Sequence, residues 1–384
     1  MKINLVLPHQ LPFPPARGGG VENLNWMLAR EFARCGHEVV AYSRAVPGLP
    51  ERATDECGIR HVRVTGYDLR PNRWVDHFYG FLYSRNLESV LEPADVTSFH
   101  TPFSFRLRRH ARLGVCAHTI HRTPKWPLPF YRRMNRVYCG SDAVVAQAQR
   151  IDPRIRNLKR IYNCVAIPHK LLPLVDKGPA EGLRFLYVGR FVPDKGIESL
   201  IRGFAHSLRE FPDNRLETVG PQTSEQGAST AFFNRMRRHL KEHQLTGNVA
   251  FFPPEFDRSK LDALIAAADV ICVPSLSGET FSMAILEAMA LAKPVLVSDF
   301  SPMPEAVDHQ ATGYVARAGD AESLADGIRF FSKRPQELTA MGRAGFEKSL
   351  RCFSVEKIAA EYVGDFSHLI ASQRNRSRTL VNAV

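Results

Sequence analysis

The chain has 384 residues and a formal net charge of +12. Its length is about twice that of a typical domain, which favours two domains. No apolar run approaches the roughly 18 residues of a membrane-spanning helix, and the run after Lys2 is too short for a signal peptide. We therefore expect a cytoplasmic protein without a membrane-spanning segment.

The seven cysteines are scattered, and no two of them have the spacing of a CxxC pair. An odd number without paired spacing argues against a disulfide framework and against a zinc site. We expect most of these cysteines to be small core residues in a reducing compartment.

The excess positive charge is concentrated in one stretch of the chain. Residues 101–160 hold 14 Lys or Arg against only Asp142 and Asp152, which accounts for the whole net charge. A basic block of this kind favours an anionic partner. The candidates are a phospholipid surface, a phosphorylated acceptor and nucleic acid.

The N-terminal half alternates short apolar runs with helical periodicity. Strands are expected at 2–7 and 38–42, with a helix at 21–35 between them that ends at Gly36. This spacing predicts a βαβ unit with parallel strands. Further strands are expected at 95–99, 116–120 and 143–146.

A linker is expected at 169–182, because this stretch is rich in proline and glycine and has little periodicity. Two parallel α/β domains joined in this way predict a cleft, with ligands bound outside the carboxyl ends of the strands. From Gln373 the chain is polar and Arg-rich, so a flexible tail is expected. Strands of the second half are expected at 183–188, 216–219, 249–252, 270–273 and 294–297.

Two cations follow the first strand of the second half. Arg190 comes directly after Gly189, and Lys195 lies in the same loop, before Gly196 and a helix. Two cations at a strand–loop–helix corner suit a diphosphate. On spacing alone, a solvated loop with incidental charges explains the pattern equally well.

A Ser/Gly loop follows the expected strand at 270–273 and is expected to open a helix near Thr280. The amides of Phe281–Met283 would then face a ligand at the helix start, where the helix dipole favours an anion. Glu287 lies within the apolar part of this helix. It is either on a narrow exposed stripe or buried so that its carboxylate can accept hydrogen bonds from ribose hydroxyls.

The N-terminal half offers a glycine loop and a group of histidines. Gly19 and Gly20 precede the first helix, where glycines let amides approach an anion, although a plain turn would look the same. A lone histidine is more often a core residue than a catalyst. His100 and His121 are better placed than most, because each follows a predicted strand.

Together these motifs resemble the retaining glycosyltransferases of family 4, which have the two-domain GT-B fold. The resemblance extends from residue 3 to about residue 370 and is stronger in the C-terminal half. It is carried by Gly189-Arg190, Lys195-Gly196, Glu279 and the run Leu286-Glu287-Ala288-Met289-Ala290.

The resemblance implies an α/β fold of two Rossmann-like, doubly wound parallel-sheet domains facing a cleft. The acceptor-binding domain would span 1–168, and the nucleotide-sugar-binding domain 183–353. A helix at 354–372 would cross back to the first domain, ahead of a flexible tail at 373–384.

The resemblance also implies roles for residues of the site. Arg190 and Lys195 would hold the donor diphosphate, Glu279 would lie against the donor sugar, and Glu287 would bind the ribose hydroxyls. His121 best matches the family histidine, with His118 as a register alternative. The rest of the donor site would comprise Gly19, Gly20, Gly189, Thr280, Phe281, Ser282 and Met283.

The chain departs from the family pattern near the sugar. The residues after Glu279 are Thr280-Phe281-Ser282, where glycine is usual after the glutamate, and Ala292 stands before Lys293-Pro294 in place of glycine. These departures leave the sugar pocket, and therefore the donor, open.

The mechanism implied by the resemblance needs no cofactor and no metal, and the sequence has no convincing Asp-x-Asp motif. The substrate is a nucleotide diphosphate sugar. The acceptor hydroxyl attacks on the face from which the diphosphate leaves, and the leaving phosphate takes the proton.

Residues 122–136 interleave basic and aromatic side chains, which is typical of a segment at an anionic lipid surface. We expect this face to rest on the inner leaflet and to collect a glycan or lipid-linked acceptor, for cell-surface polysaccharide or lipopolysaccharide synthesis. A solvated basic helix is the plainer explanation. The expected face comprises His100, Lys125, Trp126, Arg132, Arg133 and Arg136.

Two other functions fit the same sequence less well. The first is another enzyme of the GT-B fold, such as a nucleotide-sugar epimerase, and the epimerase would need no acceptor. A nucleic-acid-binding protein would use the basic block, but no recognition module accompanies that block, so we expect no nucleic acid.

Overall fold

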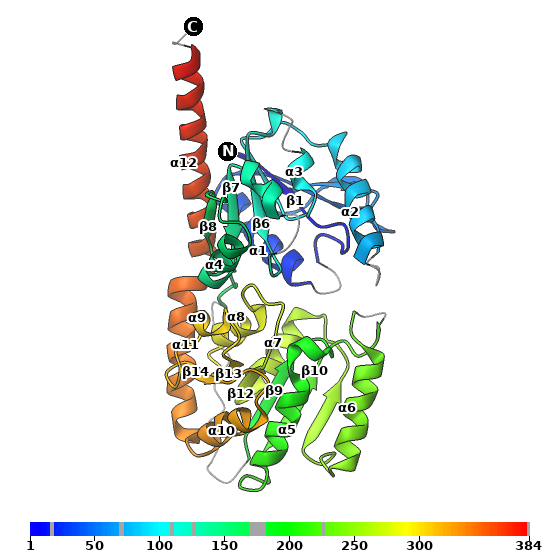
Figure 1. The fold of residues 1–384 in the computed structure, drawn as a ribbon, viewed down its shortest axis with the longest axis vertical. Helices are drawn as coiled ribbons and strands as arrows, with labels where there is room; N and C mark the ends of the chain where they lie inside the picture. Colours follow the sequence, from blue (N-terminus) through cyan, green and yellow to red (C-terminus); the bar gives the residue numbers. More distant parts are fainter. Residues whose placement is uncertain are drawn as a thin grey trace. The chain divides into compact units, whose positions relative to one another are not determined.

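The computed structural model of the chain describes residues 1–15, 19–68, 73–107, 111–124, 128–168, 182–224 and 227–381. The chain folds into two compact units (Figure 1). Unit 1 comprises Met1–Cys164 and the chain from Val355 onward, and unit 2 comprises Val165–Ser354. Of the predicted linker, only Gly182 lies within the described residues.

Unit 1 is built on an eight-stranded sheet with the order β3-β4-β2-β1-β5-β6-β7-β8. Every pair is parallel except β3 with β4 at the edge. Chain order reverses between the adjacent strands β1 and β5, which makes their boundary the switch point of the sheet. The strands are β1 (Lys2–Val6), β2 (Glu38–Arg44), β3 (Arg52–Thr54), β4 (Arg60–Val64), β5 (Val96–Phe99), β6 (Val115–Ile120), β7 (Arg136–Cys139) and β8 (Leu158–Arg160).

The C-terminal helix α12 (Val355–Val381) belongs to unit 1, where it packs on α1 and β6. Its Tyr362 ring meets Phe32 and Tyr138, and its buried Asp365 accepts hydrogen bonds from unit 1. The helix predicted at 354–372 is longer than expected, because α12 continues through residues 373–381 of the predicted tail. The other helices of unit 1 are α1 (Gly20–Arg34), α2 (Arg73–Glu88), α3 (Ser104–Leu107), α4 (Asp142–Ile151) and the 3-10 turns η1 (Ala111–Leu113) and η2 (Leu128–Arg133).

Unit 2 is built on a parallel six-stranded sheet with the order β11-β10-β9-β12-β13-β14. This is the doubly wound order in which the first and fourth strands are neighbours, so the switch point lies between β9 and β12. The strands are β9 (Arg184–Val188), β10 (Arg215–Val219), β11 (Val249–Phe252), β12 (Val270–Val273), β13 (Val295–Ser298) and β14 (Gly313–Ala316).

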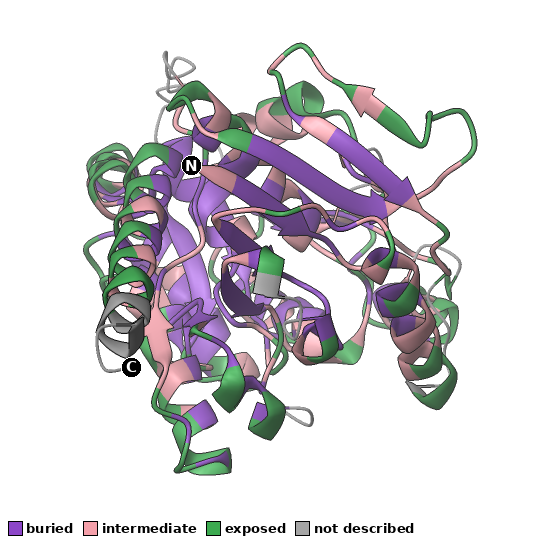
Figure 2. Ribbon diagram, turned by 90° about the horizontal axis from the view of Figure 1, so that it is seen from above, coloured by how far each residue is buried: buried purple, intermediate pink, exposed green. Residues whose placement is uncertain are grey.

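The central strands are buried along their whole length, as β5, β6, β12 and β13 show. Parallel sheets are covered on both faces by helices, and this explains the unbroken apolar runs. In Figure 2 the central strands are coloured as buried, the edge strand is coloured intermediate and exposed, and the outward faces of the helices are coloured as exposed. The helices of unit 2 are α5 (Ile197–Ser207), α6 (Thr230–Glu242), α7 (Arg258–Ala267), α8 (Met283–Ala290), α9 (Met303–Ala306), α10 (Ala321–Ser332), α11 (Leu338–Phe353) and the 3-10 turns η3 (Pro193–Lys195) and η5 (Pro335–Glu337).

One predicted strand is wrong. Residues 143–146 lie in α4, and the strand is β7, immediately before it. The Ser141 side chain accepts a hydrogen bond from the amide of Val144 and so caps the helix. An N-cap serine followed by an acidic residue is a helix start signal that outweighs the local β propensity of two valines.

Candidate active site

The loops after β9 and β12 are locked together at the switch point of unit 2. The carbonyl oxygen of Asp194 accepts hydrogen bonds from the amides of Leu276 (2.8 Å) and Ser277 (3.3 Å). Gly196 has φ +68°, and a Cβ atom there would overlap the carbonyl oxygen of Pro274. The sequence therefore needs glycine here, both for the left-handed backbone and for the close approach of the two loops.

Lys195 and Glu279 meet across this junction. The ammonium group of Lys195 donates to Oε1 of Glu279, and the hydroxyl of Ser275 donates to the same oxygen at 3.1 Å. Both side chains are mostly buried. The structure thus brings together two predicted site residues that are 84 positions apart in the sequence. They meet at the carboxyl ends of the strands, where doubly wound folds bind ligands.

Arg190 is held separately from that pair. Gly189, at the carboxyl end of β9, donates its amide to the carbonyl of Val219 in β10. The hydroxyl of Tyr187 donates to the carbonyl of Arg190 at 2.9 Å. The Arg190 guanidinium is exposed and donates to the carbonyl of Gly227 at 3.1 Å. Its backbone is therefore fixed, while its charge points to solvent.

The start of α8 differs in detail from the prediction. The helix begins at Met283, with Ser282 as its N-cap, rather than near Thr280. Thr280, Phe281 and Ser282 are all buried, and the Phe281 ring packs on Phe353 with centroids 5.3 Å apart. The side chain of Phe281 therefore serves packing, which leaves the backbone of this turn as the feature that could meet an anion.

Glu287 is buried in α8, and it is partnered by a residue that the sequence did not suggest. Arg258 Nη1, at the start of α7, lies 2.6 Å from Oε1 of Glu287. Burial raises the pKa of Glu287, and the charge of Arg258 opposes that rise. Glu287 is thus buried with a charged partner, which removes the exposed-stripe explanation.

In unit 1 the glycine loop follows β1, beside the switch point. Gly19 has φ +109°, and a Cβ atom there would overlap the carboxylate of Glu22. Gly20 is the first residue of α1. Glu22 is buried, and burial raises the pKa of its carboxyl group.

The three histidines that the sequence singled out in unit 1 divide into a pair and a core residue. Nδ1 of His100, after β5, lies 2.7 Å from Nε2 of His121, after β6, and the rings stack. His118 is buried within β6, where its ring stacks on Tyr131 with centroids 3.9 Å apart. Burial lowers the pKa of His121 to about 4 and that of His118 to about 3. These positions favour His121 over His118 as the site histidine.

The predicted membrane face needs correction. Arg136 is held by Asp365 at 2.8 Å and Arg132 by Asp152 at 2.6 Å, so neither offers the free charge that the sequence suggested. His100 is buried rather than on a surface. Arg133 is exposed. Lys125 and Trp126 lie outside the described residues.

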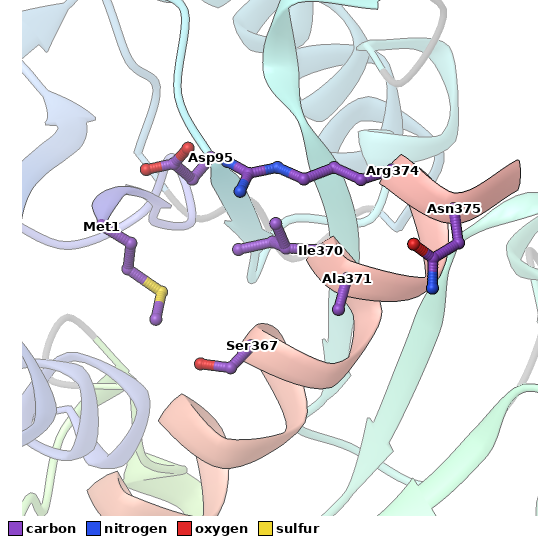
Figure 3. Close-up of a pocket in the computed structure, with 7 residues that line it drawn as sticks. All are labelled: Met1, Asp95, Ser367, Ile370, Ala371, Arg374 and Asn375. Atoms are coloured by element: carbon purple, nitrogen blue, oxygen red, sulfur yellow. The ribbon is translucent and has the colours of Figure 1, made fainter. Parts of the chain in front are cut away.

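A hollow in unit 1 lies at the amino-terminal ends of the strands, on the side opposite to the one where doubly wound sheets bind ligands. It is lined from the chain start, from the residue before β5 and from α12, and Figure 3 shows Arg374 extending across it toward Asp95. Both β1 and β5 begin here, whereas doubly wound sheets bind ligands at the carboxyl ends. The lining residues are Met1, Asp95, Ser367, Ile370, Ala371, Arg374 and Asn375.

Among the described residues, one group of three could hold a metal ion: His239, Glu242 and His243, at the end of α6. None of them lies on the loops that carry the predicted donor residues. None of the helices in the described part of the chain has the length and apolar character needed to cross a membrane.

Two doubly wound parallel-sheet units are the architecture of the GT-B glycosyltransferases. The chain belongs to glycosyltransferase family 4: residues 18–168 match the family described as Glycosyltransferase Family 4, and residues 177–348 match Glycosyl transferases group 1. This confirms the family resemblance seen in the sequence.

Two mycobacterial relatives share one name. A phosphatidyl-myo-inositol mannosyltransferase of Mycobacterium leprae is 30% identical over 355 residues, covering 85% of this chain and 86% of the relative. The protein of the same name from Mycolicibacterium smegmatis is 25% identical, covering 85% and 83%.

Solved structures share the fold over nearly the whole chain. Sucrose-phosphate synthase from Thermosynechococcus elongatus has a TM-score of 0.82 and 22% identity, covering 97% of this chain and 99% of that one. An Anabaena protein in complex with UDP and glucose has a TM-score of 0.75 and 19% identity, covering 96% and 99%. At these identities the likeness concerns the fold alone.

Proposed function

We propose that this glycosyltransferase moves a hexose-type sugar from a nucleotide diphosphate sugar to a glycan or lipid-linked acceptor, with retention of configuration and without a metal. The observation that carries the proposal is the contact of Lys195 with Glu279 at the switch point of unit 2. A cation for the leaving diphosphate and a carboxylate for sugar hydroxyls are the two groups that such a donor requires.

The comparisons support both substrates. Structures of the same fold are described in complex with UDP and with UDP-glucose, which supports a nucleotide-sugar donor. Relatives are named for phosphatidyl-myo-inositol and for D-inositol 3-phosphate, which are both anionic. An anionic acceptor matches the basic block at 101–160, and a lipid-linked one matches synthesis of a cell-surface glycan on the inner face of the membrane.

The residues of unit 2 supply the positive field of the proposed reaction. Lys195, Arg190 and the amides at the start of α8 stabilise the charge that develops on the leaving diphosphate. The acceptor hydroxyl attacks the anomeric carbon from the same face, and the departing phosphate takes its proton. His121, held by His100, is the proposed unit 1 residue beside the sugar.

Thermal unfolding with UDP-, GDP- and ADP-sugars is the first test, because a donor that binds the folded state raises the unfolding temperature. Nucleotide release is then measured with and without acceptor. Release only with an acceptor supports transfer, whereas interconversion of the sugar without an acceptor would identify an epimerase. Inversion of the anomeric configuration, seen by NMR of the product, would contradict retention.

We also propose that unit 1 binds an anionic membrane surface. Three aromatic side chains and one cation of the predicted face support this: Trp74 and Phe78 on α2 are 83% and 56% exposed, Phe130 in η2 is 45% exposed, and Arg133, also in η2, is exposed. Exposed aromatic and cationic side chains suit a lipid interface. Flotation with anionic vesicles is expected to carry the protein upward, and equal binding to neutral vesicles, or none to either, would contradict the proposal.

A further inference from the structure

The helix α7 begins with an arginine that reaches the buried carboxylate of α8. The Asp257 side chain accepts hydrogen bonds from the amides of Ser259 and Lys260, which fixes the start of α7 at Arg258. From there Nη1 of Arg258 meets Glu287 at 2.6 Å and Nη2 meets Asp262 at 2.7 Å. The guanidinium is therefore held between two carboxylates from neighbouring helices.

The two partners of this ion pair differ in exposure. The Glu287 side chain is 11% exposed and that of Arg258 is 50% exposed. Arg258 is thus the outer partner, placed on the solvent side of the buried carboxylate. Two of its five N–H donors face Glu287 and Asp262, which leaves others for a ligand that reaches Glu287 from solvent.

We propose that Arg258 is a specificity-determining residue for the nucleoside part of the donor, where it keeps Glu287 ionised and presents an N–H group to the same ribose. The inference rests on the proposed function, since it takes Glu287 as the ribose-binding group. An ionised carboxylate accepts hydrogen bonds from two adjacent hydroxyls, whereas a protonated one also donates and fits that pair less well. Among the described residues, the charged groups that act on the pKa of Glu287 are Arg258, which lowers it, and Asp262, which raises it; both lie on α7.

The test pairs a change in the protein with a change in the ligand. Binding of UDP and of its 2′,3′-dideoxy analogue is measured by calorimetry for the wild type, Arg258→Gln and Arg258→Lys, with GDP and ADP replacing UDP if one of those binds more tightly. We expect the wild type to prefer the ribose form, and Arg258→Gln to weaken that form by about tenfold or more. The affinity for the dideoxy analogue should change little, so the preference of the variant for the ribose form should shrink. Arg258→Lys should restore part of that preference.

The loss in Arg258→Gln should also grow as the pH is lowered, because the carboxyl of Glu287 takes up a proton at a higher pH when its cation is gone. Arg317→Gln is the matched control, since Arg317 forms a surface pair with Asp320 at 2.7 Å in the same unit. It should leave both affinities unchanged.

The possible failures are distinguishable. A wild type that binds no nucleoside diphosphate would overturn the proposed function together with this inference. A wild type that binds normally, with an Arg258→Gln variant that keeps the full ribose preference, would overturn the inference alone and leave a purely structural ion pair. Thermal unfolding without ligand shows whether each variant is folded.

Discussion

Nδ1 of His100 and Nε2 of His121 share one hydrogen bond 2.7 Å long, so the tautomers of the two rings are set together. The Ser98 hydroxyl lies 3.2 Å from the other nitrogen of His100. One ring must donate and the other accept. His100 is therefore buried against His121 and does not lie on the surface that the predicted acceptor face requires.

Acid should destabilise unit 1 through these rings. Burial lowers the pKa of His100, of His118 to about 3 and of His121 to about 4, while the unfolded chain keeps values near 6.5. Between these pKa values the unfolded state binds more protons than the folded state. The free energy of unfolding is therefore unaffected by these histidines above pH 6.5 and falls as the pH drops toward 4. We expect up to about 1.4 kcal/mol per pH unit for each histidine. Urea unfolding at several pH values measures the slope.

The variant His118→Phe separates this effect from general acid sensitivity. Phenylalanine keeps an aromatic ring against Tyr131 but binds no proton, so the slope between pH 6.5 and 4 should become shallower, even if the loss of the Ser104 contact lowers stability at every pH. An unchanged slope would show that His118 does not contribute to the pH dependence.

Gly196→Ala should disrupt the junction of the two donor loops. The residue has φ +68°, and an added methyl group would overlap the carbonyl of Pro274. The strained backbone alone costs about 1–3 kcal/mol, and relief of the overlap must separate the loops that align Lys195 with Glu279. We expect a lower unfolding temperature and weaker donor binding, measured by calorimetry and by titration with the nucleotide.

Gly364→Ala provides the control for that change. Gly364 lies within α12, has no atom within 4 Å of an added Cβ, and should gain about 0.5–1 kcal/mol from better helix propensity. A Gly196→Ala protein as stable as Gly364→Ala would show that the loops tolerate separation.

The sequence predicted the architecture well because parallel strands are short apolar runs between amphipathic helices. That pattern predicts that His100 and His121 each follow a strand, at the carboxyl ends of the sheet, and the structure puts them in contact. The strand predicted at 143–146 was wrong because two valines favour a strand locally, whereas the Ser141 cap fixes a helix start there.

Other features could not be predicted, because they depend on side chains that approach through folding. Arg258 lies 29 positions before Glu287, in a different helix, and no local pattern links them. Asp365 likewise depends on α12 packing against β7 and β8. Sequence periodicity predicts which face of a helix is buried, but it does not predict which charged side chain of another element contacts that face.

Lys195→Met should lower kcat/KM for sugar transfer by about 10²–10³, because one donor to the leaving diphosphate is lost. Glu279→Gln should also lower it. The double variant should be less impaired than the product of the two single effects, since each single change leaves the other residue without its partner. Steady-state kinetics with the identified donor measure all three.

Lys241→Met serves as the control for charge loss in unit 2, because Lys241 is exposed on α6. It should leave kcat/KM within about twofold of the wild type, as expected for a surface change of under 0.5 kcal/mol. Strictly multiplicative effects of Lys195→Met and Glu279→Gln would argue that the two side chains act independently in the reaction.

Asp365→Ala should weaken the attachment of α12 to the rest of unit 1. The carboxylate is buried and accepts hydrogen bonds from Arg136 (2.8 Å), Tyr138 (2.9 Å) and Lys159 (2.8 Å). Burial alone would raise its pKa, but these donors outweigh burial and lower it. The stabilisation is therefore present above the unfolded pKa of about 3.8 and is lost as pH falls through the lower folded value.

Removing this carboxylate leaves Arg136 of β7 and Lys159 of β8 without their shared partner. Because both cations are partly exposed, the cost should lie below the roughly 3–5 kcal/mol of a fully buried pair. Amide hydrogen exchange of α12 should accelerate more than that of the unit 2 helices, because the change lies in unit 1 alone. Glu361→Gln on the same helix is the control: its pair with Lys357 is largely exposed, so stability should change by less than about 0.5 kcal/mol. Equal exchange rates in the two variants would show that packing of Tyr362 and Phe366, rather than the Asp365 network, holds the helix.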